Sequence, residues 1–91
     1  RESPTVAIIN EIIKENGIVS YNDPYISHIK TQKNHSLTSV KLSSKTLADA
    51  DVVVIAVKHS VYDFKMIRSY ARLIVDLQNV YGESDDVICK L

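Results

Sequence analysis

Residues 52–57 read Val-Val-Val-Ile-Ala-Val, an unbroken apolar run in which most side chains are β-branched. A strand that faces water on one side alternates apolar and polar residues, whereas a strand covered on both faces by helices is apolar throughout. This run does not alternate. It therefore predicts a buried strand at the centre of a parallel sheet.

Helices are expected on both sides of this run. Ser43 or Ser44 is a suitable N-cap for a short helix through residues 45–50. Residues 62–72 repeat apolar side chains at the spacing of a helix with one buried face, and residues 73–77 predict another strand. Strands that alternate with helices in this order predict an α/β, Rossmann-like, three-layer domain with a short parallel sheet and right-handed crossovers.

The N-terminal part of the chain predicts another amphipathic helix. Ser3 is a good N-cap, and Pro4 suits the first helical position, where its missing N–H costs nothing. Apolar residues between Val6 and Ile13 recur three and four residues apart, and Gly17 is expected to end the helix. This helix has one face suited to a core.

The remaining stretches carry weaker signals. Residues 18–21, Ile-Val-Ser-Tyr, predict a short strand that stops at the turn formers of residues 22–24. Residues 26–39 have no regular period and are expected to form a loop, with a broken turn of helix as the alternative, followed by a short strand over residues 40–42. A last strand is predicted at residues 87–89.

Length and composition set limits on function. Ninety-one residues suit one small domain, here residues 1–91. The 11 Lys and Arg balance the 11 Asp and Glu, which disfavours nonspecific binding to nucleic acid. The single cysteine excludes an internal disulfide and a CxxC zinc site, and suits a reducing cytoplasm. The longest apolar run, residues 52–57, is too short to span a membrane, so no membrane partner is expected.

A sheet of this kind normally opens with a strand, yet residue 1 already stands at a helix start. The expectation is that this first strand is missing. Its loss would leave unpaired strand edges, which favour association between chains. A homodimer is therefore the expected state, although the remaining strands could instead close the gap within one chain.

Several residues are candidates for a site. Arg1 lies just outside the helix start, where exposed N–H groups favour an anion, although a solvated terminus is the plainer alternative. His59 follows the carboxyl end of the central strand, where ligands of open α/β sheets bind, but a structural role is favoured for it. Asp23 and Asp76 each end a predicted strand and are interpreted as turn-capping residues. Cys89 has no cationic or histidine neighbour before it and is interpreted as a buried or tail residue.

The other candidates favour structure over function. The three histidines lack the regular spacing of metal ligands, so no metal site is predicted; they are His28, His35 and His59. Aromatic side chains around the second helix are expected to belong to the core and not to a base-stacking surface; they are Tyr62, Phe64 and Tyr70.

Together these pieces resemble the C-terminal, UDP-binding domain of the UDP-glucose/GDP-mannose dehydrogenase family. The matching pieces occur in the family's order over nearly the whole chain: residues 1–4 leading a helix, the strand ending at residues 21–24, residues 47–51 before the apolar run, His59 with Phe64, and residues 74–79. The His59 and Phe64 pattern is more similar to the UDP-N-acetylhexosamine branch than to the animal UDP-glucose branch.

The resemblance implies a larger, cytoplasmic enzyme that oxidises the C6 alcohol of a UDP-sugar to a carboxylate in two NAD-dependent steps. In that family an N-terminal part binds NAD and carries the catalytic cysteine; Cys89 does not match its glycine-rich surroundings. The resemblance assigns Arg1 to the nucleotide portion of the substrate and no catalytic residue to this chain. Gln78 stands where the family often has arginine. The rival interpretation is a free-standing, Rossmann-like regulatory or interaction module whose sheet edge binds a partner instead of a nucleotide.

Overall fold

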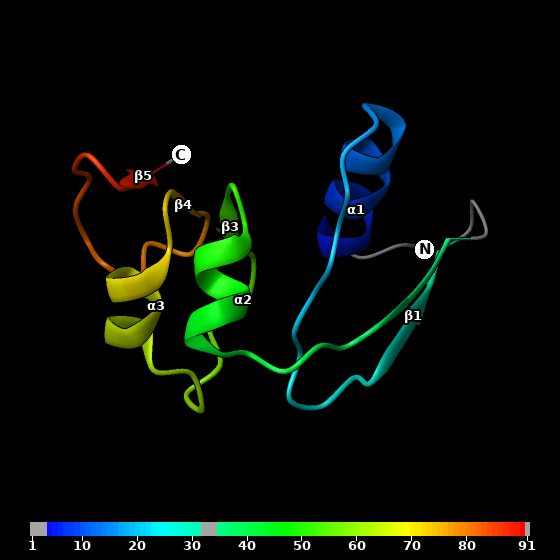
Figure 1. Cartoon of the computed structure of the whole chain (residues 1–91), viewed down its shortest axis with the longest axis horizontal. Helices are drawn as coiled ribbons and strands as arrows, with labels where there is room; N and C mark the ends of the chain where they lie inside the picture. Colours follow the sequence, from blue (N-terminus) through cyan, green and yellow to red (C-terminus); the bar gives the residue numbers. More distant parts are fainter. Residues whose placement is uncertain (1–3, 32–34, 91) are drawn as a thin grey trace. The chain divides into compact units, whose positions relative to one another are not determined.

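The computed structural model describes residues 4–31 and 35–90 (Figure 1). The chain divides into two compact units, residues 1–41 and residues 42–91. They are called the N-terminal unit and the C-terminal unit, and each is described by itself.

The N-terminal unit begins with helix α1, Pro4–Lys14, which confirms the predicted helix and its start at proline. The predicted cap at Ser3 lies outside the described residues. Gly17 follows the helix end as expected, but the left-handed residue is Asn16, with φ of 67°. Gly17 is needed for a different reason: its N–H donates to the carbonyl oxygen of Ile12 at 2.8 Å, and a Cβ there would overlap the Ile12 side chain.

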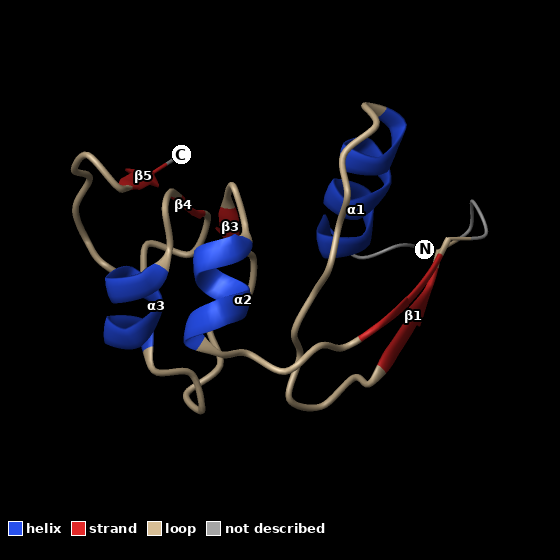
Figure 2. Ribbon diagram, in the orientation of Figure 1, coloured by secondary structure: helices blue, strands red, loops and turns tan. Residues whose placement is uncertain are grey.

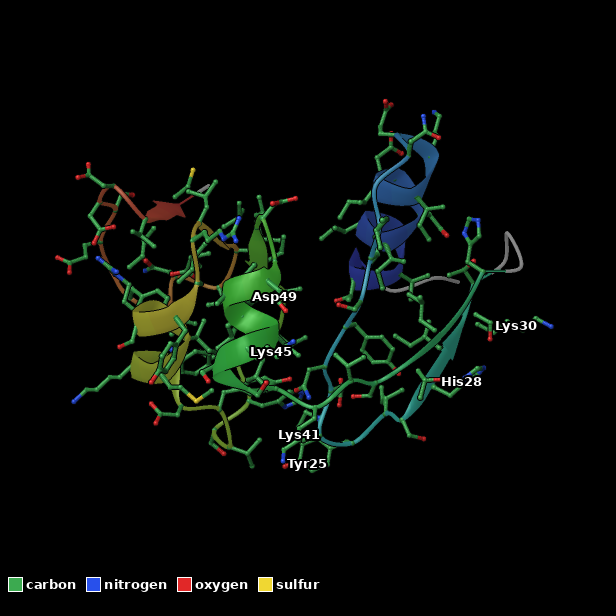
Figure 3. All side chains as sticks on the ribbon, viewed as in Figure 1. Tyr25, His28, Lys30, Lys41, Lys45 and Asp49 are labelled. Carbon is green, nitrogen blue, oxygen red and sulfur yellow. The ribbon has the colours of Figure 1, made fainter. Side chains whose placement is uncertain are left out.

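The stretch predicted as a loop, residues 26–39, contains a β-hairpin. Strand β1, His28–Lys30, pairs antiparallel with β2, Ser36–Thr38, and Ile29 lies opposite Leu37. Each strand buries only its central residue partly, while the two outer residues are exposed. Figure 3 shows His28 and Lys30 projecting from β1. One apolar residue per strand gave no detectable period, so the sequence prediction was wrong here.

Buried polar groups join the hairpin to α1. Asn10 and Thr31 are only 6% and 4% exposed. Asn10 Oδ1 lies 3.2 Å from His35 Nδ1, and the backbone N–H of His35 donates to Thr31 Oγ1. His35 is therefore a structural residue of this unit.

Two predicted strands of the N-terminal part are not formed. Residues 18–21 contribute an isolated parallel bridge between Tyr21 and Ser39, and Ile18 is fully exposed. Residues 40–42 are not extended into a strand either. Both segments lack the row of neighbouring hydrogen bonds that makes a strand stable.

The C-terminal unit is the α/β part predicted from the central run. It contains helix α2, Ser44–Asp49, strand β3, Val53–Ile55, helix α3, Phe64–Tyr70, and strands β4, Ile74–Asp76, and β5, Ile88–Lys90. The strands form one parallel sheet in the order β3-β4-β5. Among the described residues β4 is the central strand and β3 an outer one, so the predicted strand at residues 52–57 is confirmed but its predicted place at the centre of the sheet was wrong, because an apolar run indicates burial of side chains and not the number of neighbouring strands. Helices α2 and α3 pack against each other, as the ribbon shows (Figure 2). The small parallel α/β architecture is confirmed and is consistent with a Rossmann-like fold.

Both helices of this unit are capped by side chains. The Ser43 hydroxyl accepts from the Thr46 N–H at 3.2 Å, and the Thr46 hydroxyl accepts from the Ser43 N–H at 2.9 Å, a complete capping box. Asp63 caps α3 by accepting from the Met66 N–H at 3.1 Å. Helix α3 therefore begins at Phe64, two residues later than the start at residue 62 that the apolar spacing predicted.

A single apolar core holds this unit together. Ile74 at the start of β4 is 0% exposed, and the neighbouring strands contribute Ile55 and Ile88. Leu47 of α2, Ile67 of α3 and Ala71, the C-cap of α3, complete the cluster. Among the described residues, no helix is long and apolar enough to cross a bilayer.

Candidate functional site

The candidate site is the edge of the C-terminal unit's sheet at which β3 and β4 end. Residues 56–59 leave β3 there and residues 77–79 leave β4, and together they are called the carboxyl edge. In open parallel sheets, ligands bind outside these strand ends, because the loops diverge there and leave space.

Gln78 joins the two exits of the carboxyl edge. Its side-chain Nε2 donates to the carbonyl oxygen of Ala56 at 2.9 Å, while its backbone N–H donates to Asp76 Oδ1 at 3.1 Å. Asn79 follows in the left-handed conformation, with φ of 54°. The Gln78 side chain thus has a structural role at this edge.

Asp76, at the end of β4, holds the turn that follows. Its side chain is buried, and its oxygens accept from the backbone N–H groups of Gln78, Val80 and Tyr81, each at 3.1 Å. Burial raises the pKa of the Asp76 carboxyl, but these backbone donors together outweigh burial and lower the pKa below its ordinary value. With its oxygens occupied and its pKa lowered, Asp76 is unsuited to act as a general base. Its interpretation as a turn-capping residue is confirmed.

A row of four rings runs from the carboxyl edge to the segment after β4, and it is called the aromatic row. Ring centroids lie 5.8 Å apart between His59 and Tyr62, 5.9 Å between Tyr62 and Phe64, and 6.3 Å between Phe64 and Tyr81. Tyr62, Phe64 and Tyr81 also pack against the core. His59 therefore packs on the end of this row, which agrees with the structural role favoured for it.

The far end of the row is fixed by a hydrogen bond. The Tyr81 hydroxyl donates to the carbonyl oxygen of Phe64 at 2.7 Å. Burial, followed by the negative charge of Asp76, raises the pKa of the Tyr81 hydroxyl, so this group keeps its proton at neutral pH. The row was missed from sequence because Tyr81 lies in a polar, turn-rich segment with no helical or strand period.

The groups that the carboxyl edge presents to solvent suit binding better than catalysis. Lys58 is exposed and brings a formal positive charge, and Gln78 and Asn79 are exposed amides. Such groups pair with phosphates, hydroxyls and the polar rim of a base. In the part of the chain that the structure describes, no three His, Cys, Asp or Glu side chains gather as metal ligands.

The remaining predicted site residues belong to the N-terminal unit. Arg1 lies outside the described residues, so its assignment to the substrate stays a prediction. Asp23 caps its turn by accepting from the N–H groups of Tyr25 and Ile26 at 2.7 and 3.0 Å, as interpreted from sequence. His28 lies on the hairpin, with Nε2 3.1 Å from the Ser36 hydroxyl.

One open alternative is decided and one expectation is corrected. Of the two alternatives for Cys89, a buried or a tail residue, the structure excludes the buried one, because Cys89 is exposed on β5. Tyr70 was expected in the core, but it is half exposed at the end of α3 and does not belong to the core.

Comparison with known proteins identifies the family. Residues 1–83 match the model of the UDP-glucose/GDP-mannose dehydrogenase family, UDP binding domain. No curated protein and no solved structure matched the chain in the corresponding comparisons. The matched residues include the complete carboxyl edge and the aromatic row, and the chain therefore belongs to the UDP-glucose/GDP-mannose dehydrogenase family as its UDP-binding domain.

Proposed function

We propose that this chain binds the UDP moiety of a UDP-sugar in an NAD-dependent UDP-sugar 6-dehydrogenase. The substrate is UDP-N-acetylglucosamine, UDP-N-acetylmannosamine or UDP-glucose, and the larger protein oxidises its C6 alcohol to a carboxylate in the cytoplasm. The family match over residues 1–83 carries this proposal.

The geometry of the carboxyl edge supports a binding role. Lys58 supplies a charge opposite to that of a diphosphate, and the exposed amides of Gln78 and Asn79 supply neutral hydrogen-bonding groups. Asp76 precedes these amides at the end of β4, but its carboxylate is occupied by backbone N–H groups and buried. The Asp76 carboxylate is therefore not exposed to a bound anion. Binding UDP requires no proton transfer at this edge.

The residues of this chain do not fit NAD. A dinucleotide site needs a glycine-rich turn between a strand and a helix, so that the backbone approaches the pyrophosphate closely. The chain has two glycines, Gly17 after α1 and Gly82 in the segment after β4, and neither belongs to such a turn. We assign NAD and the catalytic cysteine to another part of the enzyme.

The proposed nucleotide contact of Arg1 is testable by a titration of the 91-residue chain with UDP, in which calorimetry measures the binding. The change Arg1→Ala removes a charged hydrogen bond, so we expect a loss of about 1–3 kcal/mol, or roughly 5- to 150-fold in Kd. Lys14→Ala, an exposed cation at the opposite end of α1, is the matched control and should leave the affinity unchanged.

The two possible failures have separate meanings. Absence of UDP binding at millimolar concentration, with the chain folded, would reject the proposed function. Binding that is equally strong in the Arg1→Ala and Lys14→Ala variants would reject only the role of Arg1. Hydride transfer by the 91-residue chain alone, with NAD and UDP-N-acetylglucosamine, would contradict the assignment of catalysis to another part of the enzyme.

A further inference from the structure

Strands β1 and β2 of the N-terminal unit present one polar face to solvent, and it is called the hairpin face. Alternate side chains of a strand share a face, and residues opposite each other in an antiparallel pair lie on the same side. His28 lies opposite Thr38 in the register, and Lys30 lies opposite Ser36. All four residues are exposed, while the central residue of each strand is partly buried on the other side. Figure 3 shows His28 and Lys30 projecting from β1.

The hairpin face lies in a part of the sequence without acidic residues. Residues 24–48 contain four lysines and no aspartate or glutamate, although the whole chain has 11 Asp and Glu. Lys30 forms no ion pair with any residue that the structure describes. Its ammonium group is therefore a positive charge that a ligand can neutralise.

The hairpin face also supplies hydrogen-bond donors. The Ser36 hydroxyl lies 3.1 Å from His28 Nε2, and either of the two groups can be the donor. If the hydroxyl donates, the proton of the neutral ring is on Nδ1; if the ring donates, the hydroxyl proton remains available. In both cases this pair keeps one donor for a ligand, and the Lys30 ammonium and the Thr38 hydroxyl add further donors.

Buried polar groups fix the hairpin to α1, so these donors are held in place. His35, just before β2, has Nδ1 3.2 Å from Asn10 Oδ1 of α1. Its backbone N–H donates to Thr31 Oγ1, and its carbonyl oxygen accepts from the Thr31 N–H at 2.8 Å. Asn10 and Thr31 are both buried. Donors that are ordered before binding lose less conformational entropy when a ligand binds.

The size of the hairpin face suits one compact anion. Residues directly opposite each other have Cβ atoms about 4.5–5.5 Å apart, and diagonal neighbours are about 7–8 Å apart. Four donor-bearing side chains at this spacing surround an area close to that of a single phosphate group, whose several oxygens can accept from several donors at once.

We propose that the hairpin face binds a phosphate group, with Lys30 as the charged donor and His28, Ser36 and Thr38 as the neutral ones. None of these residues belongs to the carboxyl edge, and the proposal does not depend on the binding of UDP there.

The site is tested by NMR titration of the whole chain with inorganic phosphate at pH 7, with sodium chloride adjusted to keep the ionic strength constant. We expect saturable shifts of the backbone amide signals of β1 and β2. Lys30→Ala should raise the phosphate Kd at least about fivefold, because a charge-assisted hydrogen bond is lost. Lys14→Ala, at an exposed cation of α1, is the matched control and should leave the Kd unchanged. Shifts that grow without saturation would overturn the proposal, as would equal weakening by both variants.

A neutral substitution separates a specific site from a generally positive surface. Ser36→Ala removes a hydroxyl and no charge, and it should raise the phosphate Kd about threefold or more. Ser20→Ala, at an exposed serine outside the hairpin, is the matched control and should have no effect. The hairpin amide signals of each variant show whether β1 and β2 remain paired. A Kd that Ser36→Ala leaves unchanged, with the hairpin intact, would refute the site.

The same phosphate chemistry can come from the free ion or from the terminal phosphate of a nucleotide, and UDP is the probe that separates them. Saturable shifts of β1 and β2 with UDP, weakened by Lys30→Ala, would assign the site to a phosphate ester as well as to the free ion. Saturation by inorganic phosphate alone would assign it to the free ion. UDP bound at the carboxyl edge shifts the amide signals of residues 56–59 and 77–79 instead, so failure of the proposed function is observed separately.

Discussion

Replacement of Asp76 by asparagine isolates the role of a buried carboxylate at the end of β4. One oxygen accepts from Gln78 and Val80 and the other from Tyr81, and the amide nitrogen that replaces one oxygen in the variant cannot act as an acceptor. An orphaned buried N–H costs about 1–3 kcal/mol, and the remaining bonds lose their charge assistance. We expect Asp76→Asn to lower the free energy of unfolding by about 2–4 kcal/mol at pH 7.

The pH dependence of this effect follows from the lowered pKa of Asp76. A carboxyl whose pKa is lower in the folded than in the unfolded chain stabilises the fold above its unfolded value, near 3.8, and this stabilisation is lost as pH falls through the folded pKa. The original chain and the Asp76→Asn variant should therefore approach each other in stability below about pH 4.

Urea unfolding, followed by circular dichroism and tyrosine fluorescence at pH 7 and pH 3, measures both effects. Asp49→Asn is the matched control, because Asp49 is exposed on α2 and its carboxylate lies 3.8 Å from Lys45, a pair visible in Figure 3. That change should cost less than about 0.5 kcal/mol. The reasoning is refuted if Asp76→Asn costs no more than this control at pH 7, or if its cost is the same at both pH values.

Two further predictions concern the same unit. Ser43→Ala breaks the capping box of α2 and should lower the free energy of unfolding by about 1 kcal/mol, whereas Ser44→Ala should change it little; equal costs in urea unfolding would contradict the capping assignment. Ile74→Ala removes a side chain that is 0% exposed and should cost about 2–5 kcal/mol in the same assay, whereas Leu73→Ala, at a 38% exposed neighbour, should cost much less.

The C-terminal unit was predictable from sequence because its local and tertiary signals agree. The run at residues 52–57 predicted a buried strand, and Ile55 within it is a core residue. The exact bounds were less predictable: the strand is shortened to Val53–Ile55, and the following helix starts only after its cap at Asp63. Hydrogen bonds determine where the strand and the helix end, and the spacing of apolar residues does not predict these hydrogen bonds.

The N-terminal unit was less predictable beyond α1, since its strands depend on partners that are distant in sequence. Residues 18–21 have a composition typical of a strand, but they do not form one. Tyr21 pairs with Ser39 as an isolated β-bridge. In β1 and β2, by contrast, single apolar residues face each other, Ile29 opposite Leu37, and polar residues flank them. The pairing across the hairpin stabilises these strands, and the sequence of either strand by itself does not reveal that pairing.

The sequence predicted Arg1 as the substrate-binding residue, which stays a prediction, and interpreted His59 at the sheet's carboxyl edge as structural. The sheet's carboxyl edge and His59 followed from the strand pattern, whereas the bond from Gln78 to Ala56 joins segments 22 residues apart and left no local signal. Tyr81 completes the aromatic row from a turn-rich segment, again through contacts that only the fold creates.

The carboxylates of this chain explain why its site points to binding and not to acid–base chemistry. With only 2 glycines, the chain stabilises its turns and helix starts with aspartate side chains that accept backbone N–H groups; these are Asp23, Asp63, Asp76 and Asp85. Among them, backbone N–H donors lower the pKa of the Asp76 and Asp85 carboxyls, so these two carboxylates are held ionised while their oxygens are occupied. Cations and amides are then the groups left to meet a ligand at the carboxyl edge, which is the chemistry that a UDP-binding domain requires.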